Sequence, residues 1–587
     1  MTKMVCKGLG DDTINVLIGG EAGQGITRSG SLLGRALMRA GLHVFGTNEY
    51  PSLIRGGHNF YLLRASTREV HSQIEKIDVI IALNKETAQI HESQLNPGGY
   101  IIIDEVTEIH EGDLKRGDTH LIKVPMTATV KELGGPEIMR NTVALGAAVS
   151  LLGFNHAILT DVVAATFAKR EVAEMNRLAI NRGNNYVKEH YDGFHCRIEG
   201  DVAESRRLYL SGNDAVALGA VSAGCRFYAA YPMTPASAIL DYMMAHDEAT
   251  GMVVIQSESE LAAINMVVGA SYAGLRAMTA TSGGGFSLMT EGLGLAAMIE
   301  APVVVNLGQR PAPSTGLATH SAQADLLFAI HASQGEFPRI VVAPGDIDEC
   351  FYLTKQSFNL AEEFQVPVLI LTDKYLAESE RDTAPFVPER VQIERGKLTT
   401  ADQWSGGYKR YELTDDGVSP RALPGTKGVI VSSNSNEHRD TGRSTDEPKE
   451  VTAMVEKRFR KQPNIIEAIS KLEPVRLFGD ENADATIIGW GGTKGPILEA
   501  ITSLGKEGIR ARMLQIVFME PFPAERVKEE LGKTRFNFLF ESNKTAQLGS
   551  LIRLHTGVAI ENVSLRYDGR PFNPDEISAK VLEAIKK

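Results

Sequence analysis

The chain has 587 residues, of which 43% are hydrophobic and 23% are charged, as in ordinary globular proteins. A single hydrophobic core stops growing at roughly 250–300 residues, so we expect two to four domains. The 61 basic and 73 acidic side chains give a net charge of −12, which argues against a general nucleic-acid binder and against attachment to anionic membranes. No stretch approaches the roughly 18 apolar residues of a membrane span.

The four cysteines, Cys6, Cys196, Cys225 and Cys350, are far apart in the chain and form no C-x-x-C pair. This spacing excludes a disulfide scaffold, and it excludes a cysteine-rich metal or iron–sulfur site made by this chain alone. The N-terminal sequence MTKMVCKGLGDD lacks the basic and then apolar pattern of a secretory signal. We therefore expect a cytoplasmic protein with several α/β domains.

The first block of the chain, residues 1–191, alternates short β-branched runs with helical patterns, which is typical of an α/β fold. Its predicted strands are residues 14–18, 78–83 and 100–104, and its predicted helices are 28–40, 141–152 and 158–169. The polar stretch at residues 192–207 is predicted to be a linker.

The second block, residues 208–385, opens with a helical pattern. Its predicted strands are residues 253–255, 277–280, 303–307, 339–343 and 366–371. Residues 386–475 are rich in Gly, Pro, Asp, Lys and Ser, so they are predicted to form a linker or an excursion with little core of its own. The basic run KRFRK at 457–461 is expected to lie on a solvated helix face, because its surroundings are acidic.

The third block, residues 476–587, has the same alternating character. Its predicted strands are residues 486–490 and 537–541, and its predicted helices are 496–506 and 549–554. The predicted fold class is therefore α/β, with three doubly wound units joined by linkers.

A glycine-rich segment, GGEAGQG, follows the first predicted strand and leads into a helix. Backbone N–H groups at such a turn can face a phosphate, and Gly20, Gly23 and Gly25 would supply them. The spacing is not that of a dinucleotide site, and no plain acidic residue ends the next strand, near 43–45, so NAD is disfavoured. A tight turn without a ligand explains the pattern equally well. Arg55 lies in a later loop, where it either holds an anion or is a surface arginine.

Polar side chains in the second block are predicted to lie in loops that follow neighbouring strands. Two prolines bracket Thr234 and fix its loop, and Arg310 follows a strand in a loop with several hydroxyl groups. Open α/β sheets bind ligands at the carboxyl ends of their strands, and a guanidinium group matches a carboxylate. Each loop alone can be a structural turn. Together with Glu260, they make a ligand site the better explanation.

Glu260 is the candidate for acid–base chemistry. An acid in the first turn of a helix is favoured by the helix dipole, which is a purely structural explanation. The apolar helix behind Glu260 instead predicts poor solvation, which favours the protonated carboxyl group and keeps it able to donate a proton. Glu258 is the alternative acid. The next glycine loop, with Ser282 and Gly283, also enters a helix.

Several long motifs resemble the α subunit of the 2-oxoacid:ferredoxin oxidoreductases, in the arrangement with a γ domain fused ahead of it, and the resemblance covers nearly the whole chain. The γ-like motifs are GGEAGQGITRSG and YPSLIRGGHNF. The second block has YPMTPAS, QSESELAAINMVVGASYAG, TSGGGFSLM and GQRPAPSTGLATHSAQADLLFAI. The third block, with GWGGTKGP, MEPFP, ESNKTAQLGSLIR and RYDGRPF, looks like a transketolase C-terminal-type domain. Met233 and Ala236 depart from the family's usual Y-P-I-T-P-S, but Thr234 is retained.

The resemblance implies a γ-like domain (1–191), a thiamin pyrimidine-binding-like domain (208–385) and a transketolase C-terminal-like domain (476–587). It implies an enzyme that uses thiamin diphosphate to decarboxylate a 2-oxo acid, reduces ferredoxin and forms an acyl-CoA, or runs in reverse as a carboxylase. The fused arrangement looks most like the 2-oxoglutarate enzymes. Pyruvate or a broad range of 2-oxo acids is the alternative.

The resemblance also implies roles for individual residues. Glu260 would hydrogen-bond the aminopyrimidine ring, and Arg310 would bind the substrate carboxylate with Thr234 and Thr319. The cofactor-binding residues would be Thr234, Glu260, Ser282 and Gly283. The residues that could contact CoA would be Gly20, Gly23, Gly25 and Arg55.

The chain lacks a G-D-G…N motif for magnesium and the diphosphate, and it has no metal-ligand set of its own. The resemblance implies that Mg²⁺ and the [4Fe–4S] cluster belong to a β subunit and that the thiamin site lies between the two subunits. The expected partners are therefore that β subunit, in an αβ or (αβ)₂ assembly, and ferredoxin, without nucleic acid or membrane. Two alternatives remain open: half of a non-redox thiamin transferase or decarboxylase, and a CoA- or nucleotide-binding module.

Overall fold

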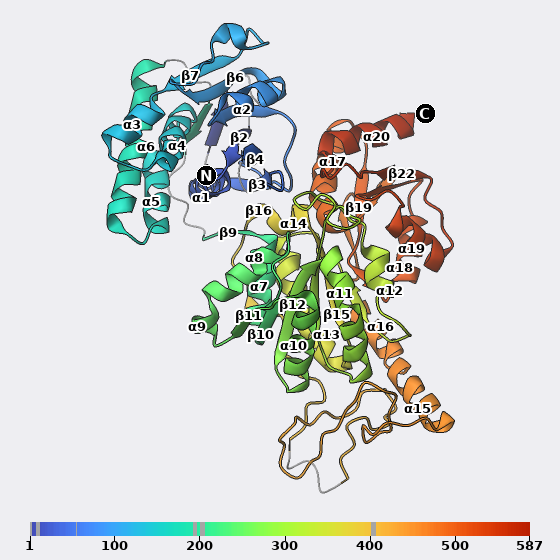
Figure 1. Cartoon of the computed structure of the whole chain (residues 1–587). Coiled ribbons are helices and arrows are strands. Elements are labelled where there is room, and N and C mark those ends of the chain that lie inside the picture. Colours follow the sequence, from blue (N-terminus) through green and yellow to red (C-terminus); the bar gives the residue numbers. More distant parts are fainter. Residues whose placement is uncertain are drawn as a thin grey trace. The chain divides into compact units, whose positions relative to one another are not determined.

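The computed structural model describes residues 3–6, 12–53, 56–191, 196–199, 206–400 and 407–586. The chain forms two compact units, and both are α/β, as the sequence predicts (Figure 1). The first unit comprises residues 1–211 with two short returns of the chain, 378–385 and 573–575. The second unit comprises the remaining residues from 212 onward.

The first unit is built on an eight-stranded mixed sheet in the order β7-β6-β5-β2-β4-β3-β16-β9. The strands from β7 to β2 are parallel, and the other neighbours are antiparallel. The bounds are β2 (Thr13–Ala22), β3 (His43–Glu49), β4 (Gly56–Ser66), β5 (Ile77–Ala82), β6 (Leu95–Asp104), β7 (His120–Val124), β9 (Leu208–Ser211) and β16 (Glu380–Thr383). A separate antiparallel pair joins β1 (Lys3–Cys6) to β8 (Cys196–Glu199).

Helices cover both faces of this sheet, so the first unit is doubly wound. The larger core lies under α1 and α4 to α6, and a smaller one lies on the opposite face beside α2. Helices α4 and α6 approach closely through Gly146 and Gly183, where an added Cβ would come 2.2 Å from the carbonyl oxygen of Ile180 and 2.0 Å from that of Val143. The helices are α1 (Ile26–Arg39), α2 (Lys85–His91), α3 (Met126–Glu132), α4 (Arg140–Leu151), α5 (His156–Thr166) and α6 (Arg170–His190).

The last two strands of this sheet come from the two ends of the predicted second block. Strand β16 lies between β3 and β9, so the two ends of that block belong to the sheet of the first unit. Buried polar groups hold the two strands in place. The Tyr61 hydroxyl donates to Glu380 at 2.6 Å and lies 3.0 Å from the Tyr209 hydroxyl, while Asp382 accepts from the Val44 N–H at 2.6 Å.

The second unit contains a seven-stranded sheet in the order β11-β10-β12-β13-β15-β14-β20. All neighbours are parallel except the edge strand β20, which is antiparallel to β14. Helices α10 and α11 lie on one face (Figure 1). The strands are β10 (Cys225–Ala230), β11 (Val253–Gln256), β12 (Arg276–Ser282), β13 (Val304–Gln309), β14 (Ile340–Val342), β15 (Val368–Asp373) and β20 (Phe518–Glu520). The helices are α7 (Gly212–Ser222), α8 (Ser237–Ala245), α9 (Asp247–Thr250), α10 (Glu260–Tyr272), α11 (Gly283–Met298), α12 (Leu326–His331), α13 (Ile347–Phe364) and α14 (Lys374–Glu378).

The third block of the sequence forms a five-stranded sheet in the same unit, in the order β17-β19-β18-β21-β22. One hydrophobic core joins the two sheets, because Trp490, Leu514 and Leu539 pack with Val305 and Leu369. The strands are β17 (Val475–Gly479), β18 (Ala485–Gly489), β19 (Ala511–Ile516), β21 (Phe536–Glu541) and β22 (Asn562–Leu565). The helices are α17 (Lys494–Lys506), α18 (Ala524–Leu531), α19 (Gln547–Thr556) and α20 (Pro574–Lys586).

The segment between the two sheets includes α15 (Pro448–Phe459) and α16 (Gln462–Ser470), and here one prediction is wrong. The basic run at 457–461 was expected on a solvated face, but Lys457 is 0% exposed and Lys461 is 1% exposed. Both ammonium groups bind the buried Glu300, at 2.6 Å each. The acidic partner lies more than 150 residues away in the sequence, so the local composition gave no sign of it.

The glycine-rich segment of the first unit also differs in part from the prediction. Gly20 lies inside β2, paired with Asn59, and only Gly23 and Gly25 belong to the turn that enters α1. Strand β3 does end in an acidic residue, Glu49, but β3 is antiparallel to β4 and is not the parallel neighbour of β2 that a dinucleotide fold requires. Among the described residues, no helix is long and apolar enough to cross a membrane.

Candidate functional site

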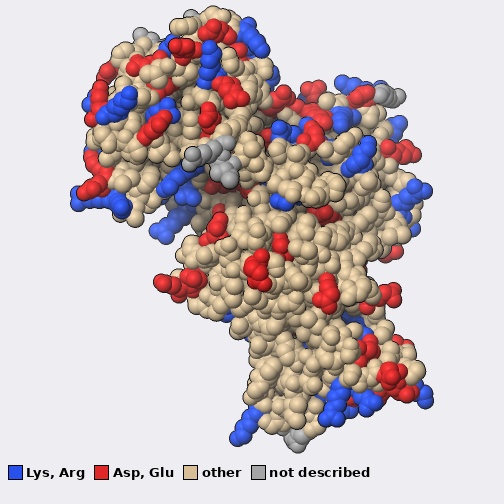
Figure 2. Space-filling view, in the orientation of Figure 1, with Lys and Arg blue, Asp and Glu red and all other residues tan. Residues whose placement is uncertain are grey.

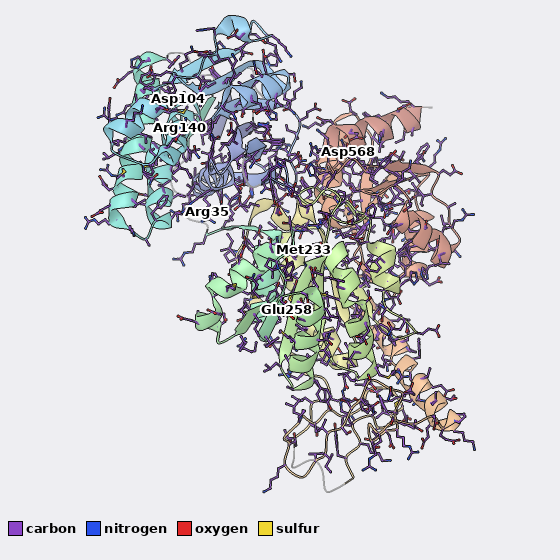
Figure 3. All side chains as sticks on the ribbon, viewed as in Figure 1. Arg35, Asp104, Arg140, Met233, Glu258 and Asp568 are labelled. Atoms are coloured by element: carbon purple, nitrogen blue, oxygen red, sulfur yellow. The ribbon has the colours of Figure 1, made fainter. Side chains whose placement is uncertain are left out.

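The predicted site residues of the second unit lie near the carboxyl edge of the seven-stranded sheet. Strands β10, β12 and β13 are parallel, so the loops that follow them leave the sheet on the same side. Thr234 lies in the loop after β10, Ser282 is the last residue of β12, and Arg310 directly follows β13. Figure 3 labels Met233, which precedes Thr234, and Glu258, which precedes α10.

Glu260 is the first residue of α10 and is buried, at 3% exposure. The helix begins here because the side chain of Ser259 caps it, accepting from the Ala262 N–H at 3.2 Å. Within the described structure, the Glu260 Oε1 atom has no hydrogen-bond partner. Glu258 is exposed, so Glu260 rather than Glu258 is the acid that could act away from water.

The Glu260 carboxyl group lies against the first turn of α11. A Cβ added to Gly285 would come 2.4 Å from Glu260 Oε1 and 2.1 Å from the Thr281 hydroxyl oxygen. The hydroxyl groups of Thr281 and Ser282 are also buried without a hydrogen-bond partner among the described residues. Buried polar atoms are normally paired, so this group of unpaired atoms indicates that a polar ligand completes the site.

Arg310 joins two of the predicted loops. Its Nη1 atom donates to the carbonyl oxygen of Thr234 at 2.8 Å, and the residue is 9% exposed. Burial lowers the pKa of Arg310, and the charges of Asp325 and Glu260 oppose this effect. Thr319 is buried on the loop that follows β13, with its hydroxyl group 3.3 Å from the His320 Nδ1 atom.

Asp325 belongs to this site, although the sequence analysis did not single it out. It is 8% exposed, and its Oδ2 atom has no hydrogen-bond partner in the described part of the chain. A Cβ added to Gly283 would come 2.5 Å from that oxygen, so Asp325 lies against the start of α11. Burial raises the pKa of Asp325 to about 6, and the charge of Arg310 opposes this effect. The available signal was an isolated acid in front of the apolar run LLFAI, which is a weak pattern.

These residues fit the aminopyrimidine part of thiamin diphosphate. The buried carboxyl group of Glu260 has one oxygen atom free to bond a ring nitrogen, and Gly285 leaves space where a side chain would displace that oxygen. No group of three or more His, Cys, Asp or Glu side chains among the described residues is arranged to hold a metal ion. What this site offers is two acids, a guanidinium group and hydroxyl groups.

In the first unit, the turn that contains Gly23 and Gly25 adopts positive φ angles of 89° and 73° at these residues, which glycine adopts readily. Gly25 is the N-cap of α1, and it has no side chain that could accept a hydrogen bond from the N–H groups of the first helical turn. The amide of Asn141 donates to the Gln24 carbonyl oxygen and fixes the turn. Arg55 lies outside the described residues.

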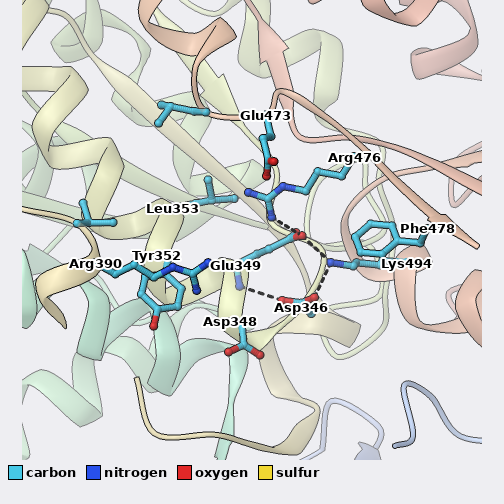
Figure 4. Close-up of a pocket in the computed structure, with 12 residues that line it drawn as sticks. Asp346, Asp348, Glu349, Tyr352, Leu353, Arg390, Glu473, Arg476, Phe478 and Lys494 are labelled. Atoms are coloured by element: carbon cyan, nitrogen blue, oxygen red, sulfur yellow. Dashed lines mark hydrogen bonds and ion pairs between the residues drawn. The ribbon is translucent and has the colours of Figure 1, made fainter. Parts of the chain in front are cut away.

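A cavity of about 420 Å³ lies elsewhere in the second unit, between α13, β17 and α17 (Figure 4). The predicted site residues are not among those that line it. Glu349 accepts hydrogen bonds there from the Gly345 N–H, Arg476, Lys494 and Gln515. Opposite charges are thus already matched at this cavity, which indicates that the network stabilises the contact between the two sheets of the unit.

Comparison with known proteins identifies the family to which the chain belongs. A family model described as "Pyruvate flavodoxin/ferredoxin oxidoreductase, thiamine diP-bdg" matches residues 218–457, which contain the site. A second model, "Pyruvate ferredoxin/flavodoxin oxidoreductase", matches residues 15–186. A 2-oxoacid:ferredoxin oxidoreductase subunit alpha from Sulfolobus sp is 34% identical, with 97% of this chain and 96% of the relative covered. The chain belongs to the 2-oxoacid:ferredoxin oxidoreductases.

Two further relatives show how much of this α subunit is shared. The solved 2-oxoglutarate:ferredoxin oxidoreductase from Magnetococcus marinus, with 2-oxoglutarate, coenzyme A and succinyl-CoA bound, is 34% identical. The match covers 98% of this chain and 100% of the Magnetococcus chain, with a TM-score of 0.89. The 2-oxoglutarate synthase subunit KorA of Methanothermobacter marburgensis is 33% identical over 64% of this chain and 99% of its own length.

Proposed function

We propose that this α subunit supplies the aminopyrimidine side of a thiamin diphosphate site that acts on 2-oxoglutarate. The observation that carries the proposal is the environment of Glu260. It is a buried acid with one unpaired oxygen, and that oxygen lies against Gly285. It also lies within the segment that matches the thiamin-binding family model. Bound thiamin diphosphate supplies the electron sink for loss of CO₂ from a 2-oxo acid. Glu260 holds a proton at the ring nitrogen, in a site that excludes water. Thr234, Ser282 and Gly283 complete the cofactor-binding surface.

Arg310 is proposed to bind the C1 carboxylate of the substrate. A guanidinium group pairs with a carboxylate through two parallel hydrogen bonds, and the contact with the Thr234 carbonyl oxygen orients it. Thr319 lies on the loop that follows Arg310 and is proposed to add a hydroxyl donor. The choice of 2-oxoglutarate rests on the similarity to the Magnetococcus enzyme, which was solved with 2-oxoglutarate bound, and to the Methanothermobacter 2-oxoglutarate synthase subunit.

CoA is proposed to bind through the first unit. The turn at Gly23 and Gly25 ends at a helix N-terminus, which favours phosphate groups. Gly20 and Arg55 complete the proposed set, with Gly20 in the strand that leads to the turn. The bound coenzyme A of the Magnetococcus enzyme is consistent with CoA as the acyl acceptor.

A β subunit is proposed to provide Mg²⁺, the diphosphate site and the [4Fe–4S] cluster, and to pass electrons to ferredoxin. An apolar surface on α10 and α11 supports such a partner, because Leu261, Met266 and Leu288 are 51%, 37% and 54% exposed. Figure 2 shows few charged side chains over these helices. Exposed apolar surface beside a catalytic acid is typical of an interface that closes when a second chain binds.

The decisive experiment replaces Glu260 by Gln in the complex with the β subunit. The amide keeps the volume of the side chain but cannot hold the proton, so we expect kcat for CoA-dependent oxidation of 2-oxoglutarate to fall by at least about 100-fold. Glu258→Gln is the matched control, because Glu258 is exposed, and it should retain most of the activity. Full activity of Glu260→Gln would contradict the proposal. Pyruvate used as well as 2-oxoglutarate would contradict only the substrate assignment.

A further inference from the structure

Asp325 is a second buried acid in the site, and the proposed function gives it no role. Its Oδ2 atom is unpaired among the described residues, although its backbone N–H donates to the Gln309 side chain at 3.1 Å. The loop that carries it is fixed on the other side by Gln547, whose Oε1 atom accepts from the Leu327 N–H at 3.0 Å. The carboxyl group is therefore held by a rigid backbone while one oxygen keeps its bonding capacity.

The charged side chain that acts on Asp325 is Arg310, and Arg310 is in turn influenced by Glu260. Among the described residues, the contacts of this loop with other elements are made by uncharged groups: Gly283 at the start of α11, and the side chains of Gln309 and Gln547. One guanidinium group thus has an acid of its own chain nearby, in the site where the substrate carboxylate is proposed to bind. Two carboxylates next to one buried cation repel each other, so both cannot be ionised without a large cost.

We propose that Asp325 is a proton-carrying neighbour of Arg310: ionised when the site is empty, and protonated when the substrate carboxylate binds the guanidinium. This inference rests on the proposed function of Arg310. The proton comes from solvent as the anionic substrate binds. When the carboxyl group leaves as neutral CO₂, with the electrons of the broken C1–C2 bond left on C2, Arg310 loses its anion and Asp325 returns the proton to solvent.

The first test is the pH dependence of KM in the complex with the β subunit. In the unchanged protein, KM for 2-oxoglutarate should rise by up to about tenfold per pH unit above pH 6, because Asp325 must take up a proton for binding. Asp325→Asn imitates the protonated form, so its KM should equal the low-pH value of the unchanged protein and should not vary with pH. A residue with a purely structural role would change KM without abolishing its pH dependence.

The second test measures the proton directly and does not depend on turnover. The complex is assembled without thiamin diphosphate, and the binding of 2-oxoglutarate is followed by calorimetry at pH 7.5 in two buffers with different enthalpies of ionisation. The difference between the buffers should correspond to uptake of about one proton by the unchanged complex and of none by Asp325→Asn. Glu525→Gln, an exposed acid at the start of α18, is the matched control and should still show the uptake.

The outcomes separate this inference from the function on which it rests. If the unchanged complex does not oxidise 2-oxo acids, the proposed function is wrong. If the complex is active but its KM is constant between pH 5.5 and 8, or if Asp325→Asn retains the pH dependence or the proton uptake, the role of Asp325 is wrong and the function stands.

Discussion

The charge of Asp325 is expected to affect folding as well as substrate binding. Burial raises the pKa of Asp325 to about 6, so the folded protein binds its proton more tightly than the unfolded chain does. Below the ordinary pKa of an aspartate, Asp325 is protonated in both the folded and the unfolded chain, and its burial costs no charge desolvation. As the pH rises from there towards 6, the unfolded chain loses this proton first, so the free energy of unfolding falls.

We therefore expect Asp325→Asn to stabilise the chain at pH 8, by at most about 3 kcal/mol, and to have little effect at pH 4. The free energy of unfolding of the two proteins, measured by urea titration at both pH values, checks this expectation. A variant that is less stable than the unchanged protein at pH 8 would show that ionised Asp325 gains more from Arg310 than it loses by burial.

Gly285 provides a sharp comparison within one glycine run. An added methyl group would collide with Glu260 and Thr281, whereas at Gly284 the nearest atom, the Ser314 carbonyl oxygen, is 3.9 Å away. We expect Gly285→Ala to cost about 1–3 kcal/mol in unfolding free energy and to lower activity strongly, because the acid must move. Gly284→Ala should be neutral or slightly stabilising, because alanine favours the helix. The two variants are compared by thermal unfolding and by kcat. Equal behaviour of the two would show that Gly285 is not needed to make room for the Glu260 carboxyl group.

The candidate site was only partly predictable from single residues. Thr234, Glu260 and Arg310 stand in distinctive contexts: between prolines, at the start of an apolar helix and after a strand. Asp325 has no comparable context, and 14 residues of loop separate it from Arg310 in the sequence. Burial of a charged side chain is decided by distant partners, which is also why the basic run at 457–461 was misjudged.

Among the helices, α15 and α16 are attached to the second unit by buried charges. Lys457 and Lys461 both bind Glu300, and Arg410 donates to the Glu300 carbonyl oxygen at 2.9 Å. Burial alone would raise the pKa of Glu300, but the neighbouring ammonium groups hold it well below its ordinary value. The stabilisation is therefore present above the ordinary pKa of a glutamate and is lost in acid.

Replacement of Glu300 by Gln should leave two ammonium groups buried without a counter-charge. We expect a loss of about 3–5 kcal/mol in unfolding free energy at pH 7, measured by denaturant titration. Glu467→Gln, which breaks the exposed pair with Lys471, is the control and should change stability very little. A loss no larger than that of the control would mean that the lysines release their protons or reach water.

Most elements lie close to their predicted positions, because β-branched runs and apolar helical periodicity reflect local burial. Strand β5, for example, was predicted at 78–83 and is found at Ile77–Ala82. The extension of β2 through Gly19 and Gly20 was not predicted, since glycine is disfavoured in strands. The pairing of that segment with β4 supplies the backbone bonds that override this preference.

Assembly with a partner should depend on the exposed apolar side chains of α10 and α11. We expect the double variant Leu261→Asp with Leu288→Asp to fold normally but to lose the β subunit during co-purification, with affinity reduced by at least about 100-fold. Leu554→Asp is the control, because Leu554 is 73% exposed on α19, outside this surface. Sedimentation velocity of the mixed subunits gives the readout. Normal assembly of the double variant would place the interface elsewhere.

The three large α/β sheets were predictable from the alternation of strands and helices, but the way in which the blocks share strands and combine into two units was not. Strand β20 comes from the third block and extends the sheet of the second, and one core spans both sheets. Pairing between blocks depends on backbone groups at sheet edges, which leave no periodic trace in the sequence.

The two strands that close the first unit have a bearing on how such chains can be divided. If the chain were cut after residue 207, β3 would lose β16 and β9 and would present a bare row of N–H and carbonyl groups. The return of the chain through β16 therefore covers an edge at which the first unit could otherwise pair with a second copy of itself.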